Sequence, residues 1–251
     1  MTFGNGLNKL KFCYIKYITY LCFKVYKTKM DKITHNAFIN ILHKDYGECF
    51  IKVLSKRTFN DLIKEIDHIS DNSGFYGYSD SDDDTSNTGK NKFVGDLFEI
   101  FTEAFFIQFK SDNRIGIFDY KPVPSEDDNG VDGFGKNISG LPCTIQIKYR
   151  SNPTYKLTER DIKQFAYQSI INYNVDYKRN DTMIIFTNCD GLHWYTESKV
   201  FDNKLRVING KTISKLIDNN EGFWNSFKEI IINSVNEVGI DKLTEIFKEK
   251  L

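Results

Sequence analysis

The spacing of apolar residues predicts helices first and an α/β core afterwards. Between residues 33 and 69, apolar residues recur at the three- and four-residue spacing of amphipathic helices, as at Phe38, Ile41 and Leu42. After residue 90 the chain continues with a strongly apolar helical stretch, NKFVGDLFEIFTEAFFIQF. Three short patterns that favour strands follow it, RIGIFDY, GVDGFG and TIQIKYR.

The second half of the chain alternates in the same way. LTERDIKQFAYQSIINY predicts a helix with Thr158 as its N-cap and Asp161 three residues later, and the continuous apolar run TMIIFTN predicts a buried strand. HWYTE and KLRVIN are expected to form strands, and two helices are expected around residues 223–235 and 242–247. The order α-β-β-β-α-β-β-β-α predicts an α/β fold with a mixed central sheet flanked by helices.

Local composition predicts four regions. Residues 1–30 hold six Lys and no Asp or Glu, and Met30 is an alternative start, so this basic aromatic stretch is expected to lie outside the native fold. Residues 31–70 are expected to form a small helical module. Residues 71–90 carry five Asp and predict an acidic disordered linker, which leaves 91–251 as the main domain.

Charge and cysteine content narrow the function classes. The 34 Lys+Arg balance the 34 Asp+Glu, which argues against a uniformly basic nucleic-acid coat but allows a local basic cleft. The five cysteines form no C-x-x-C pair, so a disulfide framework and a cysteine-bound zinc are not indicated and a reducing, intracellular location is expected. Lys16 and Lys24 interrupt the apolar run near the start, which argues against a signal peptide or a membrane partner.

Common catalytic motifs are missing from the sequence. GKT at 210–212 lacks the glycine that a phosphate loop needs at position 205, where Leu205 stands. The four histidines show no H-E-x-x-H spacing, and no serine lies in a G-x-S-x-G elbow. Nucleotide cradles, zinc proteases and serine hydrolases are therefore not supported.

One group of polar residues remains, spread over a helix and two strands. Glu99 lies on the apolar helix with Glu103 one turn later, Asp132 lies in GVDGFG, and Gln146 and Lys148 lie in TIQIKYR. On a strand Gln146 and Lys148 point to one face while their apolar neighbours point to the other. The turn-rich KNISGLP between the strands predicts a hairpin that lays Asp132 beside Gln146.

This set fits metal-assisted hydrolysis of a phosphodiester. Oxygen ligands from carboxylates and a carbonyl hold Mg²⁺, and the ion offsets charge that develops on the scissile phosphate. A nearby ammonium can orient the attacking water and stabilise the transition state.

The helix glutamate, GVDG and QIKYR resemble the PD-(D/E)xK nuclease superfamily, specifically its Mrr-like restriction endonuclease branch, in which Q-x-K replaces E-x-K. The resemblance covers about Phe93 to Trp224, and TMIIFTN and RVINGKTISKLI match later elements of that branch. It implies a restriction-endonuclease-like sheet and Mg²⁺-dependent cleavage of DNA that leaves 5′-phosphate ends, with Mn²⁺ able to substitute.

The resemblance also implies a role for each site residue. Asp132 would be the principal metal ligand, Gln146 the substituted second ligand, Lys148 the catalytic lysine and Glu99 the helix acid. The backbone carbonyl of Ile147 would add a further ligand. Glu103 remains an alternative helix acid, because residues four apart share a helix face.

Contacts with DNA and the runner-up functions follow from the same region. A basic, tyrosine-containing stretch predicts a phosphate-contacting rim, although a solvated helix face explains it equally well; the candidate contacts are Tyr149, Arg150, Lys156, Arg160 and Lys163. Trp194 and Trp224 are expected in the core. The alternatives are a junction-resolving nuclease and an inactive DNA-binding or interaction module with the same fold. Cutting both strands would call for a homodimer or two successive events.

Overall fold

A computed structural model of the chain describes residues 32–34, 38, 41, 52–53, 55–72, 86–124 and 129–238. All of them belong to one compact unit that begins at Lys32. Residues 1–30 and the helix expected at 242–247 lie outside the described residues, as does most of the helix expected near Phe38. None of the described helices is long and apolar enough to cross a bilayer.

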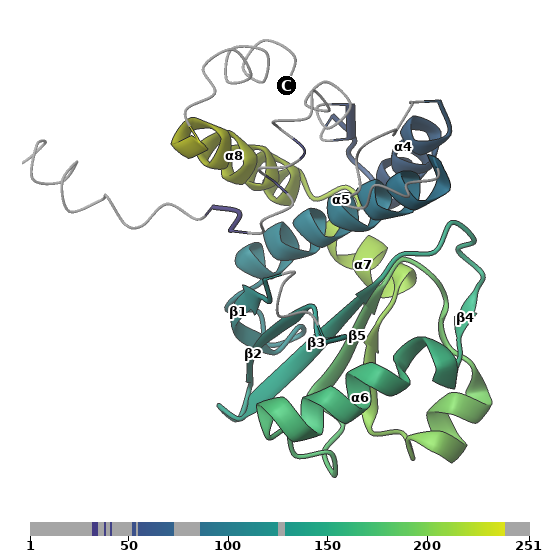
Figure 1. Cartoon of the computed structure of the whole chain (residues 1–251). Coiled ribbons are helices and arrows are strands. Elements are labelled where there is room, and N and C mark those ends of the chain that lie inside the picture. Colours follow the sequence, from purple (N-terminus) through teal and green to yellow (C-terminus); the bar gives the residue numbers. More distant parts are fainter. Residues whose placement is uncertain are drawn as a thin grey trace, which may run out of the picture. The chain divides into compact units, whose positions relative to one another are not determined.

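The core is a mixed five-stranded sheet whose strands follow one another in space as they do along the chain (Figure 1). β1 (Ile117–Pro122), β2 (Gly133–Asn137) and β3 (Pro142–Lys148) form an antiparallel meander. β5 (Met183–Thr187) pairs parallel with β3, and β7 (Leu205–Ile208) pairs parallel with β5. The predicted α/β class with a mixed sheet flanked by helices is therefore confirmed.

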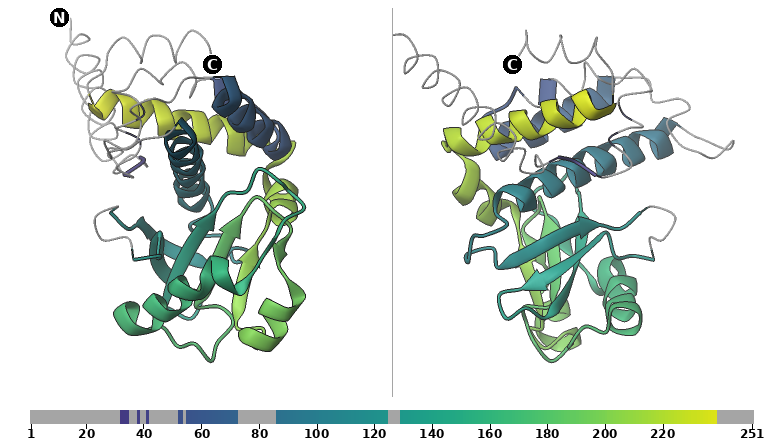
Figure 2. Two further views of the ribbon diagram at one scale, coloured as in Figure 1. Left: turned by 45° about the vertical axis from the view of Figure 1, so that its right-hand side comes forward. Right: turned by 90° about the vertical axis from the view of Figure 1, so that its left-hand side faces the viewer.

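Helices cover both faces of this sheet (Figure 2). α5 (Ser86–Gln108) lies on one face, where Phe98 and Phe105 place their ring centroids 5.7 and 5.2 Å from that of Phe186 on β5. α4 (Phe59–Asn72), α7 (Gly210–Ile217) and α8 (Glu221–Val238) add their apolar side chains to the same core. α6 (Glu159–Tyr173) covers the other face with Ile162 and Phe165. Because helices lie on both faces, all five residues of β5 are buried, which explains its continuous apolar pattern.

The start of α6 is fixed by the predicted capping pair. Asp161 accepts hydrogen bonds from the backbone N–H of Thr158 at 2.7 Å and from its hydroxyl at 2.9 Å. Asp161 also binds the guanidinium of Arg150, which follows β3, at 2.6 Å. One carboxylate thus caps α6 and ties it to the end of the central strand.

The prediction of a strand at HWYTE is wrong. Only Gly191–Leu192 form a strand, β6, which pairs with β4 (Lys156–Leu157) in a separate two-stranded sheet. After it the chain turns into helix, with a π-helical segment, η1, at Thr196–Val200. Backbone N–H groups that would extend a ladder bond locally instead, as Glu197 does to the carbonyl of His193 at 3.0 Å.

Both ends of the predicted acidic linker, residues 71–90, are helical. Asp71 and Asn72 complete α4, and Ser86 to Lys90 begin α5, while residues 73–85 lie outside the described ones. An ion pair between Lys90 and Asp71 joins the two helices. The helical segment after residue 55 packs in the same core as the sheet, since the rings of Phe59 and Phe101 lie 5.6 Å apart.

Asp161→Ala should lower the free energy of unfolding by about 1–2 kcal/mol, because it removes the helix cap and the Arg150 pair. Burial alone would raise the pKa of Asp161, but hydrogen bonds from Thr158 and Arg150 hold it below its ordinary value of 3.8. The stabilisation is therefore present at neutral pH and is lost as pH falls through the lowered folded-state pKa. Urea unfolding across the acid range measures both effects.

Glu159→Ala is the control for this substitution. Glu159 is exposed in the same first turn of α6, and its removal should change stability by less than about 0.5 kcal/mol. Equal losses in the two variants would contradict the role given to Asp161.

Candidate active site

The predicted hairpin brings Asp132 beside Gln146. Gly133 of β2 is paired with Ile145 of β3, so Asp132, which directly precedes β2, lies opposite Gln146. The N–H of Asp132 donates to the carbonyl of Ile145 at 3.1 Å, and the carboxylate accepts from the N–H of Ile147 at 2.5 Å. The carboxylate therefore lies against β3 between Gln146 and Lys148.

The side chains of β3 divide between the two faces as predicted. Ile145 and Ile147 enter the core beneath α5, whereas the hydroxyl of Thr144 bonds to that of Ser169 on α6 at 2.8 Å. Gln146 and Lys148 share the face of Thr144 because side chains alternate along a strand. This face is less open than expected, since Gln146 is only 2% exposed and Lys148 is half-buried.

The side-chain oxygen of Gln146 is buried and has no hydrogen-bond partner among the described residues. The amide nitrogen donates to the carbonyl of Gly130 at 3.1 Å, which fixes the amide so that Oε1 points the other way. A buried acceptor without a partner costs about 1–3 kcal/mol. A buried oxygen on the strand that binds the carboxylate of Asp132 suits a cation, so Asp132 and Gln146 fit the expected Mg²⁺.

The ammonium of Lys148 makes no ion pair or hydrogen bond with another residue in the described ranges. Its backbone is held, since its carbonyl accepts from the hydroxyl of Thr187 at 2.6 Å. Between Gln146 and Lys148, the carbonyl of Ile147 points toward the same neighbouring strand as its N–H, and so toward Asp132.

The two helix acids differ in their surroundings. Glu103 is buried, and its Oε1 accepts from the backbone N–H of Thr34 at 2.8 Å and from its hydroxyl at 2.6 Å. Glu99, one turn earlier on α5, is half-buried. Glu103 thus anchors Thr34 to α5.

Tyr120 on β1 is a site residue that the sequence did not indicate. Its hydroxyl oxygen is buried and finds no hydrogen-bond partner in the part of the chain that the structure describes, although the residue as a whole is half-buried. Burial raises the pKa of Tyr120 well above its ordinary value, and the charges of Glu103, Glu99 and Asp132 raise it further. The charges of both helix acids and of Asp132 therefore act on the same phenol.

Asp132 belongs to two sets of site residues. The first set is Asp132, Gln146 and Lys148, which the hairpin brings together. The second set is Asp132, Glu99 and Glu103, whose charges all act on Tyr120. The described part of the chain contains no set of three His, Cys, Asp or Glu side chains placed to hold a metal ion. A cation here would therefore depend on the amide oxygen of Gln146.

The residues predicted to contact DNA fall into two sets. Arg150 is held by Asp161 and lies over the ring of Tyr155 at 5.6 Å, and Tyr149 donates to Asp67 on α4 at 2.6 Å. Burial raises the pKa of Tyr149, and the bond to Asp67 raises it further. These two side chains brace the fold. The exposed members of the rim are Lys156, Arg160 and Lys163.

The prediction that both tryptophans lie in the core is right for Trp224 and wrong for Trp194. Trp224 is buried, and its ring N–H donates to the carbonyl of Ile217 at 2.9 Å. Trp194 is 62% exposed, because the chain leaves β6 just before it. Its ring meets the exposed Tyr195 edge-on at 5.8 Å.

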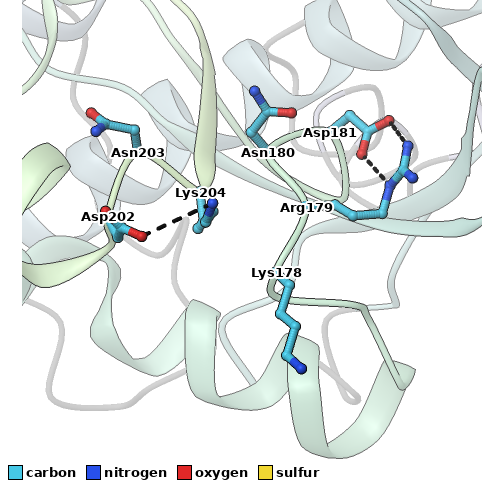
Figure 3. A pocket seen from close by; sticks show the side chains of 7 residues that line it. All are labelled: Lys178, Arg179, Asn180, Asp181, Asp202, Asn203 and Lys204. Carbon is cyan, nitrogen blue, oxygen red and sulfur yellow. Dashed lines mark hydrogen bonds and ion pairs between the residues drawn. The ribbon is translucent and has the colours of Figure 1, made fainter.

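A separate polar pocket of about 650 Å³ lies at the amino ends of β5 and β7 (Figure 3). Two of its cations are paired, Arg179 with Asp181 at 2.8 Å and Lys204 with Asp202 at 4.0 Å. Since β3 and β5 run parallel, this pocket is at the opposite end of the strands from Lys148. It is distinct from the candidate site.

Gly133→Ala should lower stability by about 1–3 kcal/mol, because a Cβ there would come within 2.4 Å of the Tyr120 ring. The ring has little room to move, since its centroid lies 4.7 Å from that of Phe106. A double-mutant cycle with Tyr120→Leu, followed by urea unfolding, should recover most of this cost.

Gly95→Ala on α5 is the matched control. Outside the backbone of α5 itself, a Cβ at Gly95 meets no atom of the described residues within 4 Å, so alanine should stabilise the helix by about 0.5–1 kcal/mol. Unchanged stability in Gly133→Ala would contradict the packing of Tyr120 on this glycine.

Comparison with known proteins adds no relative to this picture. No protein-family model matches the sequence, and no curated protein is significantly similar to it. The site is therefore defined by the geometry of this chain.

Proposed function

We propose that the protein is a Mg²⁺-dependent DNA endonuclease with a restriction-endonuclease-like fold. The observation that carries the proposal is the buried oxygen of Gln146, which has no hydrogen-bond partner within the described ranges and lies on the strand that binds the carboxylate of Asp132. The order of α5, three antiparallel strands, α6 and a parallel strand supports the finer fold assignment.

The cation would be held by Asp132, by Oε1 of Gln146 and by the carbonyl of Ile147. Mg²⁺ prefers oxygen ligands and keeps several of its waters, which suits a site with few protein ligands. When bound, the ion supplies charge that offsets the negative charge on the scissile phosphate. Because Gln146 carries no charge, Asp132 provides the main electrostatic attraction.

The protein's own groups would orient the reaction. The bond from the N–H of Ile147 fixes the direction of the Asp132 carboxylate before any ligand arrives. Lys148 shares the strand face of Gln146, and its ammonium is available to orient the attacking water and to stabilise charge on the phosphate. Glu99 is proposed as the helix acid from its place in GDLFE, and Glu103, whose Oε1 binds Thr34, remains the alternative.

DNA would approach along the exposed rim residues Lys156, Arg160 and Lys163. Three ammonium or guanidinium groups can contact successive phosphates and hold the backbone in register without reading sequence. Cleavage of both strands would require a homodimer or two successive events at one site.

The cleavage assay uses plasmid DNA with Mg²⁺, with Mn²⁺ and with EDTA. The wild type should cut with either metal and not with EDTA. Asp132→Asn should abolish cutting, because it removes the charged ligand. Lys148→Ala should lower the single-turnover rate by about 10²–10³-fold, the usual loss for a group that stabilises transition-state charge.

Lys136→Ala is the control for loss of a lysine. Lys136 is exposed on β2 and pairs with Asp119 at 3.4 Å, so its replacement should leave the rate unchanged. Full activity in Asp132→Asn and Lys148→Ala would contradict the site. DNA binding without cutting in any metal would favour an inactive binding module.

Exposed Trp194 favours a second candidate, a nuclease specific for branched or unpaired DNA. The backbone N–H of His193 donates to the carbonyl of Leu157 at 2.8 Å, which holds Trp194 and Tyr195 beside the strand of Lys156. Exposed aromatic rings next to cations are the usual platform for stacking unpaired bases.

Trp194→Ala should weaken binding of a four-way or flapped DNA about 5- to 100-fold, corresponding to the loss of one stacked base. Binding of a plain duplex of the same length should change little. Fluorescence anisotropy with both DNAs measures the difference, and Trp194→Phe should retain most of the preference. Equal losses on both DNAs would count against this candidate.

A further inference from the structure

The hydroxyl of Tyr120 occupies a position that packing alone does not explain. Within the described ranges, two side-chain polar atoms are buried without a partner, the Tyr120 hydroxyl and Oε1 of Gln146. Both belong to the candidate active site. A phenylalanine would fill the same space without burying an unsatisfied oxygen.

The ring of Tyr120 is fixed in place. It lies on Gly133, where a Cβ would come within 2.8 Å of the hydroxyl oxygen, and it packs against Phe106 on α5. Gly133 follows Asp132 directly, so the hydroxyl is held beside the start of β2. It cannot turn away to find water without displacing Phe106 or the backbone of β2.

Three carboxylates lie near enough to this hydroxyl for their charges to act on it. Glu103, Glu99 and Asp132 all act on the phenol electrostatically, and none of them accepts its hydrogen bond. Carboxylates attract a divalent cation, and the waters that such a cation carries are strong hydrogen-bond donors. A phenol oxygen is a suitable acceptor for such a water.

We propose that Tyr120 is a positioning residue that holds a water of the hydrated divalent cation bound at Asp132 and Gln146. This inference rests on the proposed function, since it assumes a cation at that site. Groups that bind the ligands of a metal, and not the metal itself, typically change metal affinity or activity by about 10–100-fold. Sequence reasoning would not assign this role, because Tyr120 lies on a strand that contributes no other site residue.

The test compares Tyr120→Phe with wild type in two measurements. Without divalent cation, the melting temperature of Tyr120→Phe should equal or exceed that of wild type, because an unsatisfied oxygen has been removed. In a Mn²⁺ titration, the concentration that gives half of the maximal thermal shift should rise about 10–100-fold. The Mn²⁺ concentration for half-maximal DNA cleavage should rise in parallel.

Two other Tyr→Phe changes serve as controls. The hydroxyl of Tyr149 donates to Asp67 at 2.6 Å, so Tyr149→Phe should lower the melting temperature. Tyr177 is exposed at the far end of the strands, and Tyr177→Phe should leave both melting temperature and Mn²⁺ response unchanged.

The outcomes separate the two proposals. A lower melting temperature in Tyr120→Phe without cation, or an unchanged Mn²⁺ response, would overturn the role of Tyr120 and leave the proposed function standing. A wild type that shows neither a thermal shift nor cleavage with Mg²⁺ or Mn²⁺ would overturn the proposed function and this inference together.

Discussion

The hydrogen bond from the N–H of Ile147 to the carboxylate of Asp132 is the constraint on which the site depends. The N–H of Asp132 binds the carbonyl of Ile145, so one residue is attached to β3 through both its backbone and its side chain. The direction of the carboxylate therefore follows from the register of β2 and β3. A slip of one residue would move Gln146 and Lys148 to the opposite face and separate them from Asp132.

The aromatic packing of α5 sets the second half of the site. Phe98 and Phe105 lie on Phe186, which fixes the helix against the face of the sheet opposite Gln146. Glu103 is used to bind Thr34, so the chain before α4 takes one of the two helix acids. Asp132, which directly precedes β2, connects the two halves of the site. Its carboxylate binds the N–H of Ile147, and its charge raises the pKa of Tyr120.

Local signals predicted much of this arrangement. The turn residues of KNISGLP predicted the hairpin, the continuous apolar run predicted β5, and Thr158 with Asp161 predicted the start of α6. The burial of Gln146 was not predictable, because alternation identifies a polar face but not the helix that covers it. The position of Tyr120 was also hidden, since it depends on an irregular pairing of β1 with β2 between Phe118 and Lys121. The strand predicted at HWYTE does not form. Alternation of polar and apolar residues is a local pattern, whereas a strand also needs a neighbouring strand with which to pair.

The distribution of donors and acceptors has a consequence for the order of binding. Asp132, Gln146 and the helix acids present oxygen atoms, and within the described ranges the buried oxygens of Gln146 and Tyr120 have no hydrogen-bond partner. Lys148 shares the strand face of Gln146 and brings a positive charge to the same region. A phosphate that comes close to these carboxylates is repelled by them unless a cation offsets their charge. In a nuclease built on this geometry, a divalent cation bound first would offset this repulsion and favour entry of the scissile phosphate.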